Sequence, residues 1–412
     1  MRVSIIGGGV VGLTTAYALV RQGVAVDLID ARSELASETS FANGGQLSYR
    51  YVAPLADAGV PMQAIGWLLK SNSPLKLRPR LDMQQWKWMA EFLLACRSSV
   101  NQANAQKLLE LALHSRDTLH NWLSAAAIDD FAWRRNGKLV AFRDEASFKH
   151  HSKHLSDPQN QRVVTRAGLA TLDSCLSNTP FVGGIFTPDE EVGDCYKFCQ
   201  SLVKELASSN LCNFVLGKPV TDVVHRSGVI EKLRFGNDEL DVQNLVLCTG
   251  YKTSVLKLPL LSIPIYPLKG YSLTVPISKG NMAPEVSITD YDRKIVYARL
   301  DDKLRVAAMV DIVGFNPEVD PGRINAIRSA AQELFPNGGN YREAVEWAGM
   351  RPATPTGVPI IGATPHYKNL WLNVGHGALG FTLACGSADL LANLISERKA
   401  PLNPQLYSYR TA

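Results

Sequence analysis

At the start of the chain, the spacing of apolar residues changes from strand-like to helix-like and back. Residues 3–6 form a short β-branched run that leads into a glycine cluster. The spacing over residues 10–21 predicts a helix that ends near Gly23, and residues 24–30 form a second β-branched run. Because parallel strands need a helical crossover of about this length, the pattern predicts a β-α-β unit.

The middle of the chain has two further patterns. From residue 81 to about 126, and again over 193–208, apolar residues recur at the three- and four-residue spacing of amphipathic helices. Strands are predicted at 138–142, 184–187, 213–216, 220–224 and 230–235, with a hairpin partner at 239–248, and alternation typical of an antiparallel sheet covers 271–276, 295–300 and 304–310. That sheet indicates a second domain. No linker separates the halves, so we expect the two domains to be interleaved in sequence.

Composition places the chain among compact globular proteins. Hydrophobic residues make up 46% and charged residues 20%, and the 31 Gly and 22 Pro have no fixed period, which excludes disordered, collagen-like and coiled-coil classes. The 43 Lys and Arg against 38 Asp and Glu leave a charge of +5 without dense basic runs, so we expect no nucleic-acid partner. Seven scattered cysteines favour reduced thiols. We expect no metal site, because the histidines at 150, 151 and 154 lie in a charged segment typical of a solvated face.

A glycine motif after the first predicted strand is the strongest local signal. Gly7-x-Gly9-x-x-Gly12 opens the predicted helix, and Asp30 ends the next strand. Gly7 permits a tight turn, Gly9 lets the backbone approach a pyrophosphate, and Gly12 lets helix and strand pack closely. The helix N-terminus offers free N–H groups to an anion, and Asp30 can accept hydrogen bonds from a ribose. The motif predicts a dinucleotide site, and both NAD and FAD use it.

A second glycine turn near the other end of the chain favours FAD. The apolar run 370–374 leads into Gly375-x-Gly377-x-x-Gly380 and a helix predicted from about 381 to 395. The positive end of that helix could stabilise the charge that reduction places on a flavin. The alternative is a plain tight turn.

A third apolar run, residues 245–250, ends in Thr-Gly and follows a three-stranded β stretch. It can lie beside the first strand and leave its end near the cofactor. On its own it is typical of ordinary core.

Five ordered blocks resemble the bacterial D-amino acid dehydrogenase small-subunit family, within the D-amino acid oxidase and glycine oxidase superfamily of FAD enzymes. The blocks are the N-terminal glycine motif, ETSFANGGQ at 38–46, YPLKGYS at 266–272, GMRPATPTG at 349–357 and LWLNVGHGALGFT at 370–382. The resemblance extends from Met1 to about residue 396. It implies noncovalent FAD and a fold of α/β and α+β type, in which a Rossmann-like FAD-binding domain of glutathione-reductase type is interleaved with a substrate domain built on an antiparallel sheet plus helices. The boundaries we expect are 1–50, 190–255 and 345–412 for the FAD-binding domain, and 51–189 and 256–344 for the substrate, or cap, domain.

The resemblance also implies which residues contact FAD. The first turn and second strand hold the ADP half, the segment 39–47 runs along the pyrophosphate and flavin, and the C-terminal turn contacts the isoalloxazine. Side-chain donors and two glycines make 39–47 suitable as a ligand loop, although it also fits a polar surface loop. The expected contacts are Gly7, Gly9, Val10, Val11, Gly12, Asp30, Ala31, Arg32, Thr39, Ser40, Asn43, Gly44, Gly45, Gln46, Leu47, Val220, Thr249, Gly250, Gly375, Gly377, Leu379, Gly380, Phe381 and Thr382.

Arg351 is the candidate for binding the substrate. A planar guanidinium makes a two-point contact with a carboxylate, and Pro352 restrains the backbone that aims it. The alternative is a surface ion pair, but the match to the family's Gly-x-Arg-Pro block favours the substrate role. Tyr271 resembles the family's active-site tyrosine, Tyr51 lies near a loop that could cover the ligand, and His376 could hydrogen-bond flavin or substrate. Either tyrosine could equally be a packed aromatic.

The resemblance implies oxidative deamination of D-amino acids to 2-oxo acids and ammonia. With a neutral amine, hydride can pass from Cα to flavin N5 without a strong base. A D-proline or D-hydroxyproline-type imino acid dehydrogenase and an oxygen-using oxidase remain as alternatives. A flavin-dependent NAD(P)H reductase would need a second dinucleotide unit, which is not evident, and a flavin protein without turnover is a further possibility.

The family passes electrons to a membrane quinone. Trp67-Leu-Leu69 and Trp86-x-Trp88, with neighbouring lysines, could rest on a bilayer surface, although helix packing explains these residues equally well. We therefore expect a cytoplasmic protein whose association with the inner face of the cell membrane would be peripheral and not integral. Tyr49-Arg50 stands where close relatives have a proline-glycine pair, and Ala307-Ala308 where glycines are usual. Both changes would reshape the substrate pocket.

Overall fold

A six-stranded sheet carries the two glycine turns. The computed structural model describes residues 1–412 except 69–72, 126–127, 256–257 and 410–412. The sheet has the order β19 (Ile360–Ala363), β20 (Leu370–Val374), β13 (Asn244–Leu247), β1 (Arg2–Ile6), β2 (Ala25–Asp30) and β9 (Cys212–Leu216). All neighbouring pairs are parallel except β19 with β20. The predicted β-α-β unit is confirmed, and β13 lies beside β1 as expected.

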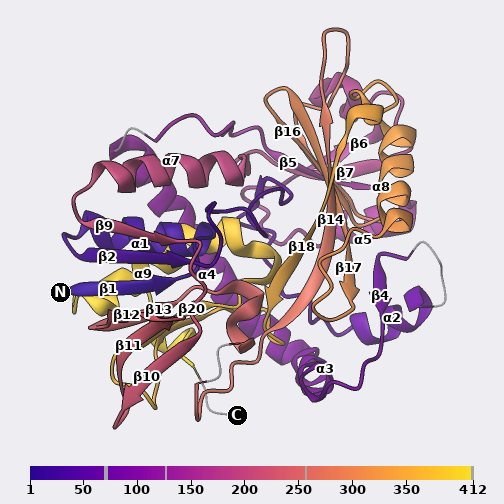
Figure 1. The fold of residues 1–412 in the computed structure, drawn as a ribbon. Coiled ribbons are helices and arrows are strands. Elements are labelled where there is room, and N and C mark those ends of the chain that lie inside the picture. The colour runs from indigo at the N-terminus through magenta and orange to yellow at the C-terminus, as the bar shows by residue number, and fades with distance from the viewer. Residues whose placement is uncertain (69–72, 126–127, 256–257, 410–412) are drawn as a thin grey trace.

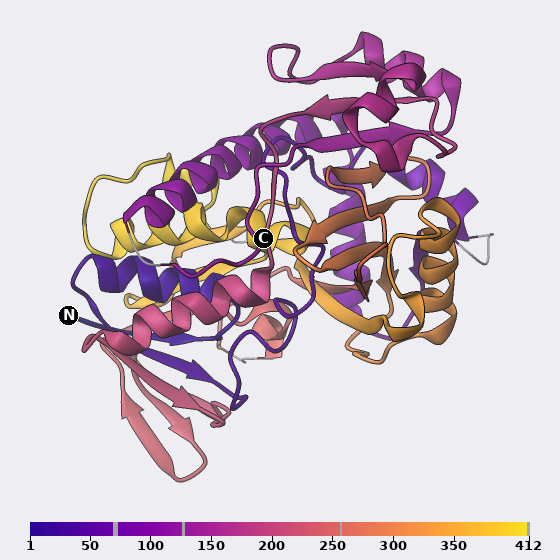
Figure 2. The same cartoon turned by 90° about the horizontal axis from the view of Figure 1, so that it is seen from above.

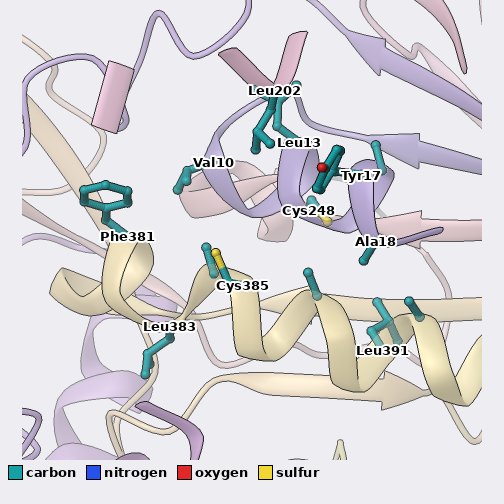
Figure 3. Close-up of a cluster of buried hydrophobic side chains, with 14 of the residues drawn as sticks. Val10, Leu13, Tyr17, Ala18, Leu202, Cys248, Phe381, Leu383, Cys385 and Leu391 are labelled. Carbon is teal, nitrogen blue, oxygen red and sulfur yellow. The ribbon is translucent and has the colours of Figure 1, made fainter. Parts of the chain in front are cut away.

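Helices cover this sheet in layers (Figure 1). They are α1 (Val10–Arg21), α4 (Ser98–Ala125), α7 (Cys195–Ser208) and α9 (Gly380–Ile395). The N-terminal and C-terminal helices pack directly on each other, and their apolar side chains form one buried cluster with Leu202 of α7 (Figure 3). In Figure 2, α4 lies along α9 on the side away from α1. The chain ends are therefore joined through a shared core.

A small three-stranded antiparallel sheet is inserted before β13. It consists of β10 (Asp222–Arg226), β11 (Val229–Phe235) and β12 (Asp238–Asp241). The prediction of a single hairpin strand over residues 239–248 is wrong, because this segment forms two strands. Only β12 pairs with β11, and the chain then enters the six-stranded sheet as β13.

A nine-stranded mixed sheet forms the second half of the molecule. Its order is β18 (Val345–Ala353), β14 (Tyr266–Pro276), β17 (Lys303–Ile312), β16 (Ile295–Leu300), β15 (Ser287–Asp290), β5 (Lys138–Phe142), β7 (Gly183–Thr187) and β6 (Arg162–Thr165), with β4 (Leu75–Leu77) paired to β17. Helix α8 (Pro321–Leu334) packs on one face through residues such as Ile324 and Ile327. The opposite face contacts the segment after β2, since Ser272 Oγ donates to the Ala42 carbonyl at 2.7 Å.

The remaining elements connect these sheets. They are β3 (Gln46–Leu47) paired with β8 (Glu191–Val192), α2 (Val60–Leu68), α3 (Met83–Ala95), α5 (Glu145–Lys153), α6 (Arg166–Leu172), and the short 3-10 turns Ser174–Leu176, Gly250–Val255, Tyr341–Glu343, Gly377–Leu379 and Pro404–Leu406.

Two elements differ from the domain boundaries that the sequence suggests. Strand β18 lies in the nine-stranded sheet although residues 345–412 were expected in the FAD-binding domain. Helix α4 lies in the segment expected for the cap domain, yet Leu108 and Leu111 belong to the core shared by α1 and α9. Strand β18 therefore lies with the nine-stranded sheet, and α4 lies with the helices of the six-stranded sheet.

Among the described residues, the stretch Gly377–Ile395 is long and apolar enough to cross a membrane. It has 19 residues and a mean hydropathy of 1.5, and 67% of this window is buried inside the protein. A core helix passes the same test of length and composition.

Candidate functional site

The first turn requires glycine because the backbone packs closely there. Gly7 has a φ of +111°, and a Cβ there would overlap the carbonyl oxygen of Cys248 at the end of β13. A Cβ on Gly12 would overlap the carbonyl oxygen of Gly7. The chain can make this turn between β1 and α1 only with glycine at both positions.

The turn leaves the start of α1 directed at a polar loop. No side chain caps α1 at Gly9, whereas the backbone N–H of Val10 donates to Ser40 Oγ at 3.0 Å. A Cβ added at Gly9 would come no closer than 3.4 Å to that same hydroxyl. The N–H groups of Val11 and Gly12 have no acceptor in the described structure, so the N-terminal end of α1 keeps backbone donors that an anion could bind.

Asp30 braces this turn from the end of β2. Its carboxylate accepts hydrogen bonds from the Gly8 N–H at 2.6 Å and the Arg32 N–H at 2.8 Å. The segment before β10 lies alongside, because the N–H of Gly217 donates to the Arg32 carbonyl at 2.9 Å. The structure thus brings the segment of Val220 close to residues 30–32, where the sequence predicts the ADP half of FAD.

The C-terminal turn lies at the same sheet edge as the first. The parallel strands β1, β13 and β20 are adjacent, so their carboxyl ends meet, and Gly375 follows β20 with a φ of +85°. Helix α1 is tied to both α9 and β20, since Thr14 Oγ1 donates to the Ala384 carbonyl of α9 at 3.2 Å and Asn373 Nδ2 of β20 donates to Thr15 Oγ1 at 3.0 Å. Two motifs from opposite ends of the chain therefore form one composite site.

Open space borders several glycines of this edge. A Cβ at Gly250 would have no described atom within 4 Å, one at Gly377 would meet only the Ala353 Cα at 4.0 Å, and one at Gly380 only the His376 Cβ at 3.9 Å. Exposed backbone beside a helix N-terminus suits a long phosphate-bearing ligand. The geometry fits FAD, since the α1 start at Gly9 and Val10 could hold its pyrophosphate and the turn at Gly377 and Gly380 could border its flavin.

The segment 39–47 joins the two halves of the molecule. Thr39 Oγ1 donates to the Met350 carbonyl at 2.8 Å, one residue before Arg351, and Asn43 Oδ1 accepts from the Gly45 N–H at 3.0 Å. The carbonyl of Gln46 accepts from Thr382 Oγ1, at the start of α9, at 3.5 Å. We call residues 39–47 the flavin loop, since it connects the candidate cofactor turns with the cap sheet.

Arg351 lies on the face of the nine-stranded sheet that contacts this loop. Its side chain lies over Gly270, where any Cβ would overlap the guanidinium. One nitrogen, Nη1, donates to the Met309 carbonyl at 2.8 Å, and no carboxylate forms an ion pair with Arg351 in the described part of the chain. Burial lowers the pKa of Arg351 to about 10, opposed by Asp311, so the guanidinium stays charged at neutral pH. Arg351 is therefore a partly buried cation that lacks an anionic partner among the described residues.

Tyr271 is not brought to this site. It points to the opposite face of the sheet, where its hydroxyl donates to Asp311 Oδ2 at 2.8 Å and its ring packs in the cluster beneath α8. Asp311 is also paired with the buried Arg323 of α8. Burial raises the pKa of Tyr271 well above its ordinary value. The structure therefore gives Tyr271 a place in the core of the cap domain.

His376 lies in the C-terminal turn but its imidazole is directed into α9. It is 2% exposed, and its Nε2 lies 3.0 Å from Ser387 Oγ. The Ser387 hydroxyl also lies within hydrogen-bond distance of the Leu383 and Ala384 carbonyls, so the Nε2–H tautomer of His376 can donate to it. Burial lowers its pKa to about 3, so the ring is neutral at physiological pH. We assign His376 to positioning the turn.

Tyr51 lies on the flavin-loop side of the cap sheet. Its hydroxyl is 2.7 Å from Thr187 Oγ1 and accepts from Gln161 Nε2 at 3.2 Å. Burial raises its pKa. The ring is therefore fixed by the cap domain and borders the end of the flavin loop.

The two unusual pairs in the sequence occupy different positions. Tyr49 donates to the buried Glu191 at 3.2 Å, and the Arg50 side chain is paired with Asp157 at 2.8 Å. Ala307 contacts the flavin loop, since a Cβ on Gly44 would lie 3.7 Å from the Ala307 Cβ, whereas Ala308 packs in the cluster beneath α8. Only Ala307 of that pair borders the candidate site.

Sequence reasoning missed a buried lysine at the start of β5. Lys138 is 5% exposed and contacts residues that follow Gly45 in the chain. A charged residue that begins an otherwise apolar strand, KLVAF, is the signal that could have indicated it. No group of three potential metal ligands occurs within the described ranges.

Paired glycine turns, a helix start that could bind an anion and a partly buried arginine without a described ion-pair partner are together the features expected of a flavin-dependent oxidoreductase. The chain matches the FAD dependent oxidoreductase (DAO) family over residues 2–394 and belongs to that family.

Curated relatives match nearly the whole chain. D-amino acid dehydrogenase 2 of Pseudomonas aeruginosa is 57% identical over 397 residues, covering 96% of this chain and 95% of the relative. D-amino acid dehydrogenase of Vibrio cholerae is 39% identical and covers 98% of this chain and 97% of the relative.

Solved structures share the fold. Glycine oxidase from Bacillus cereus superposes with a TM-score of 0.74 at 20% identity, over 100% of this chain and 99% of that one. L-proline dehydrogenase from P. horikoshii gives a TM-score of 0.73 at 14% identity, over 99% and 96%. The predicted combination of α/β and α+β architecture is confirmed.

Proposed function

We propose that this protein is an FAD-dependent D-amino acid dehydrogenase, which converts D-amino acids to 2-oxo acids and ammonia. The observation that carries the proposal is Arg351, a partly buried guanidinium on the sheet face that meets the flavin loop, where no described residue supplies an anionic partner. The substrate class follows the 57% and 39% identical relatives, which are both D-amino acid dehydrogenases.

The residues of the chain have separate tasks in this reaction. Arg351 binds the substrate carboxylate through the guanidinium nitrogens that do not contact Met309, and so orients Cα. The α1 start, with Gly9 and Val10, would hold the pyrophosphate, and the turn from Gly375 to Thr382 would border the flavin. When bound, FAD supplies the acceptor for the hydride that leaves Cα. The neutral His376 keeps the turn in place and takes up no proton near pH 7.

We propose a quinone-type electron acceptor and a peripheral position on the inner membrane face. The hypothesis that this surface contacts a membrane rests on Trp86, whose side chain on α3 is 48% exposed. Trp88 does not contribute, because it is 3% exposed and its Nε1 donates to the Ala353 carbonyl at 2.8 Å. The predicted membrane contact at 67–69 includes residue 69, which lies outside the described residues. The side chains of residues 67 and 68 are not described either.

Anaerobic bleaching of the bound flavin tests the reaction. Purified protein loaded with FAD should lose its yellow colour with D-amino acids, or with D-proline if the substrate is an imino acid. The matched L-amino acids serve as controls and should leave the colour unchanged. Bleaching by NADH alone, or by no D-amino or D-imino acid, contradicts the proposal. Reoxidation by a soluble quinone or by oxygen then distinguishes a dehydrogenase from an oxidase.

A further inference from the structure

A buried ammonium group contacts the end of the flavin loop. Lys138 Nζ donates to Gln46 Oε1 and to Ser48 Oγ, both at 2.9 Å, and lies 4.7 Å from the centroid of the Tyr51 ring. All three partners belong to the stretch 46–51, directly after Gly45. The first residue of β5 therefore fastens this stretch to the cap sheet.

Gln46 is held from both sides by these contacts. Its Oε1 accepts from Lys138, and its Nε2 donates to Ser287 Oγ at 2.7 Å and to the Ile288 carbonyl at 3.3 Å. Its backbone carbonyl accepts a hydrogen bond from Thr382 Oγ1, where the C-terminal turn leads into α9. The side chain of Gln46 thus links Lys138 to the candidate flavin site.

The charge on Lys138 is only partly balanced. The counter-charge that influences it is Glu190, which is fully buried, yet the two form no ion pair among the described residues. Glu190 is instead paired with Arg50: its Oε1 accepts from the Arg50 N–H at 3.1 Å and lies 3.7 Å from Arg50 Nη1, while its Oε2 has no partner in the described structure. Burial lowers the pKa of Lys138 to about 8, and Glu190 opposes this shift, so most molecules keep the charge at pH 7.

A buried and incompletely paired cation is costly to maintain. Buried charged groups with a shifted pKa cluster at functional sites. Reduction makes a flavin more electron-rich, and a fixed positive charge in a dry site stabilises that form. The expected effect of Lys138 on a nearby flavin is therefore easier reduction.

We propose that Lys138 is a positioning residue that holds the flavin loop through Gln46 and makes the bound FAD easier to reduce. This inference rests on the FAD binding in the proposed function, and not on the identity of the substrate.

The test compares Lys138→Met, which removes the charge, with Lys138→Arg, which keeps it. Lys149→Met, on the exposed surface of α5, is the matched control. Each FAD-loaded protein is titrated with dithionite beside a reference dye to obtain the flavin reduction potential, and FAD affinity is measured by fluorescence. We expect Lys138→Met to have a more negative potential and flavin reduction by substrate to slow about tenfold. Lys138→Arg should recover most of the potential, and Lys149→Met should match the unmodified protein.

A wild-type potential in Lys138→Met with FAD bound would overturn the proposal. If that variant does not fold, Lys138→Gln replaces it, since the amide can still donate to Gln46 or Ser48 without carrying charge. The same potential criterion applies. Because dithionite needs no amino acid, the result is independent of whether D-amino acids bleach the flavin. Failure of the proposed function and failure of this inference are therefore distinguishable.

Discussion

Arg351 is the residue whose contacts most directly imply a substrate. Its guanidinium packs over Gly270, is partly buried, and makes one hydrogen bond within the described structure, to a backbone carbonyl. We expect Arg351→Ala to raise the KM for a D-amino acid about 100-fold, because two charge-assisted hydrogen bonds are lost. Arg351→Lys should raise it about tenfold, since lysine lacks the planar fork. Steady-state kinetics with an artificial acceptor measure both effects.

Arg342→Ala is the matched control, because Arg342 is exposed and forms no ion pair within the described ranges. An unchanged KM in both Arg351 variants would remove this residue from the substrate site.

His376 makes stability depend on pH in a predictable direction. Its pKa in the folded protein is about 3, against an ordinary value of 6.5. Between these values the unfolded chain binds a proton that the folded protein does not, so stability falls as pH falls through this window. From pH 7 to 5, this residue should account for about 2 kcal/mol of the lost unfolding free energy.

His376→Gln should therefore lose about that much less over the same pH interval, because an amide can donate to Ser387 at any pH. Urea unfolding at the two pH values measures this difference. The exposed His154→Gln should behave as the unmodified protein does. Equal losses in all three proteins would contradict the assignment of a neutral buried ring.

At the level of elements, the start of α1 sets the geometry of the cofactor turn. A methyl group on Gly12 would overlap the Gly7 carbonyl, so Gly12→Ala must displace α1 from β1. We expect at least a tenfold loss of FAD affinity and a lower melting temperature, although alanine normally favours a helix over glycine by about 1 kcal/mol. Flavin fluorescence and thermal unfolding measure these changes.

Gly66→Ala provides the control, since Gly66 lies in α2 with no described atom within 4 Å of an added Cβ. If Gly12→Ala binds FAD as well as this control does, close packing does not explain the motif.

Elements with strong local signals could be predicted from the sequence. The helix at 10–21 and the strand at 138–142 have the bounds that their apolar spacing indicates. The partners of strands that pair over long distances could not be predicted in this way. No local sequence pattern shows that residues 239–248 divide between two sheets at Val242 and Gln243. Both sheets accept apolar strands, and only tertiary packing selects the partner.

The candidate site shows the same difference between local and distant information. Glycine spacing indicates both turns, and the structure places them at one sheet edge. The direction of Tyr271 could not be read in this way, because a one-residue change of register moves a strand side chain to the other face. Lys138 acts through residues about 90 positions away, so no local pattern connects it with the flavin loop.

Across the whole molecule, the candidate cofactor site lies where distant segments meet. The flavin loop contacts the cap sheet at Ser272 and the start of α9 at Thr382. A ligand bound there would contact elements from both ends of the chain. FAD that binds only the folded protein should therefore stabilise the entire assembly by mass action.

We expect removal of FAD to lower the melting temperature by about 5 °C or more when compared with FAD at 1,000 times its dissociation constant. Ligand binding raises the free energy of unfolding by about 4 kcal/mol at that ratio. In a chain of this size, each kcal/mol raises the melting temperature by roughly 1 to 2 °C. Differential scanning calorimetry across a series of FAD concentrations measures the dependence. Riboflavin, which lacks the pyrophosphate that the α1 start would bind, is the matched control ligand and should give a much smaller shift. Equal stabilisation by both ligands would show that the N-terminal glycine turn does not contribute to binding, and the composite site would then reduce to its C-terminal half.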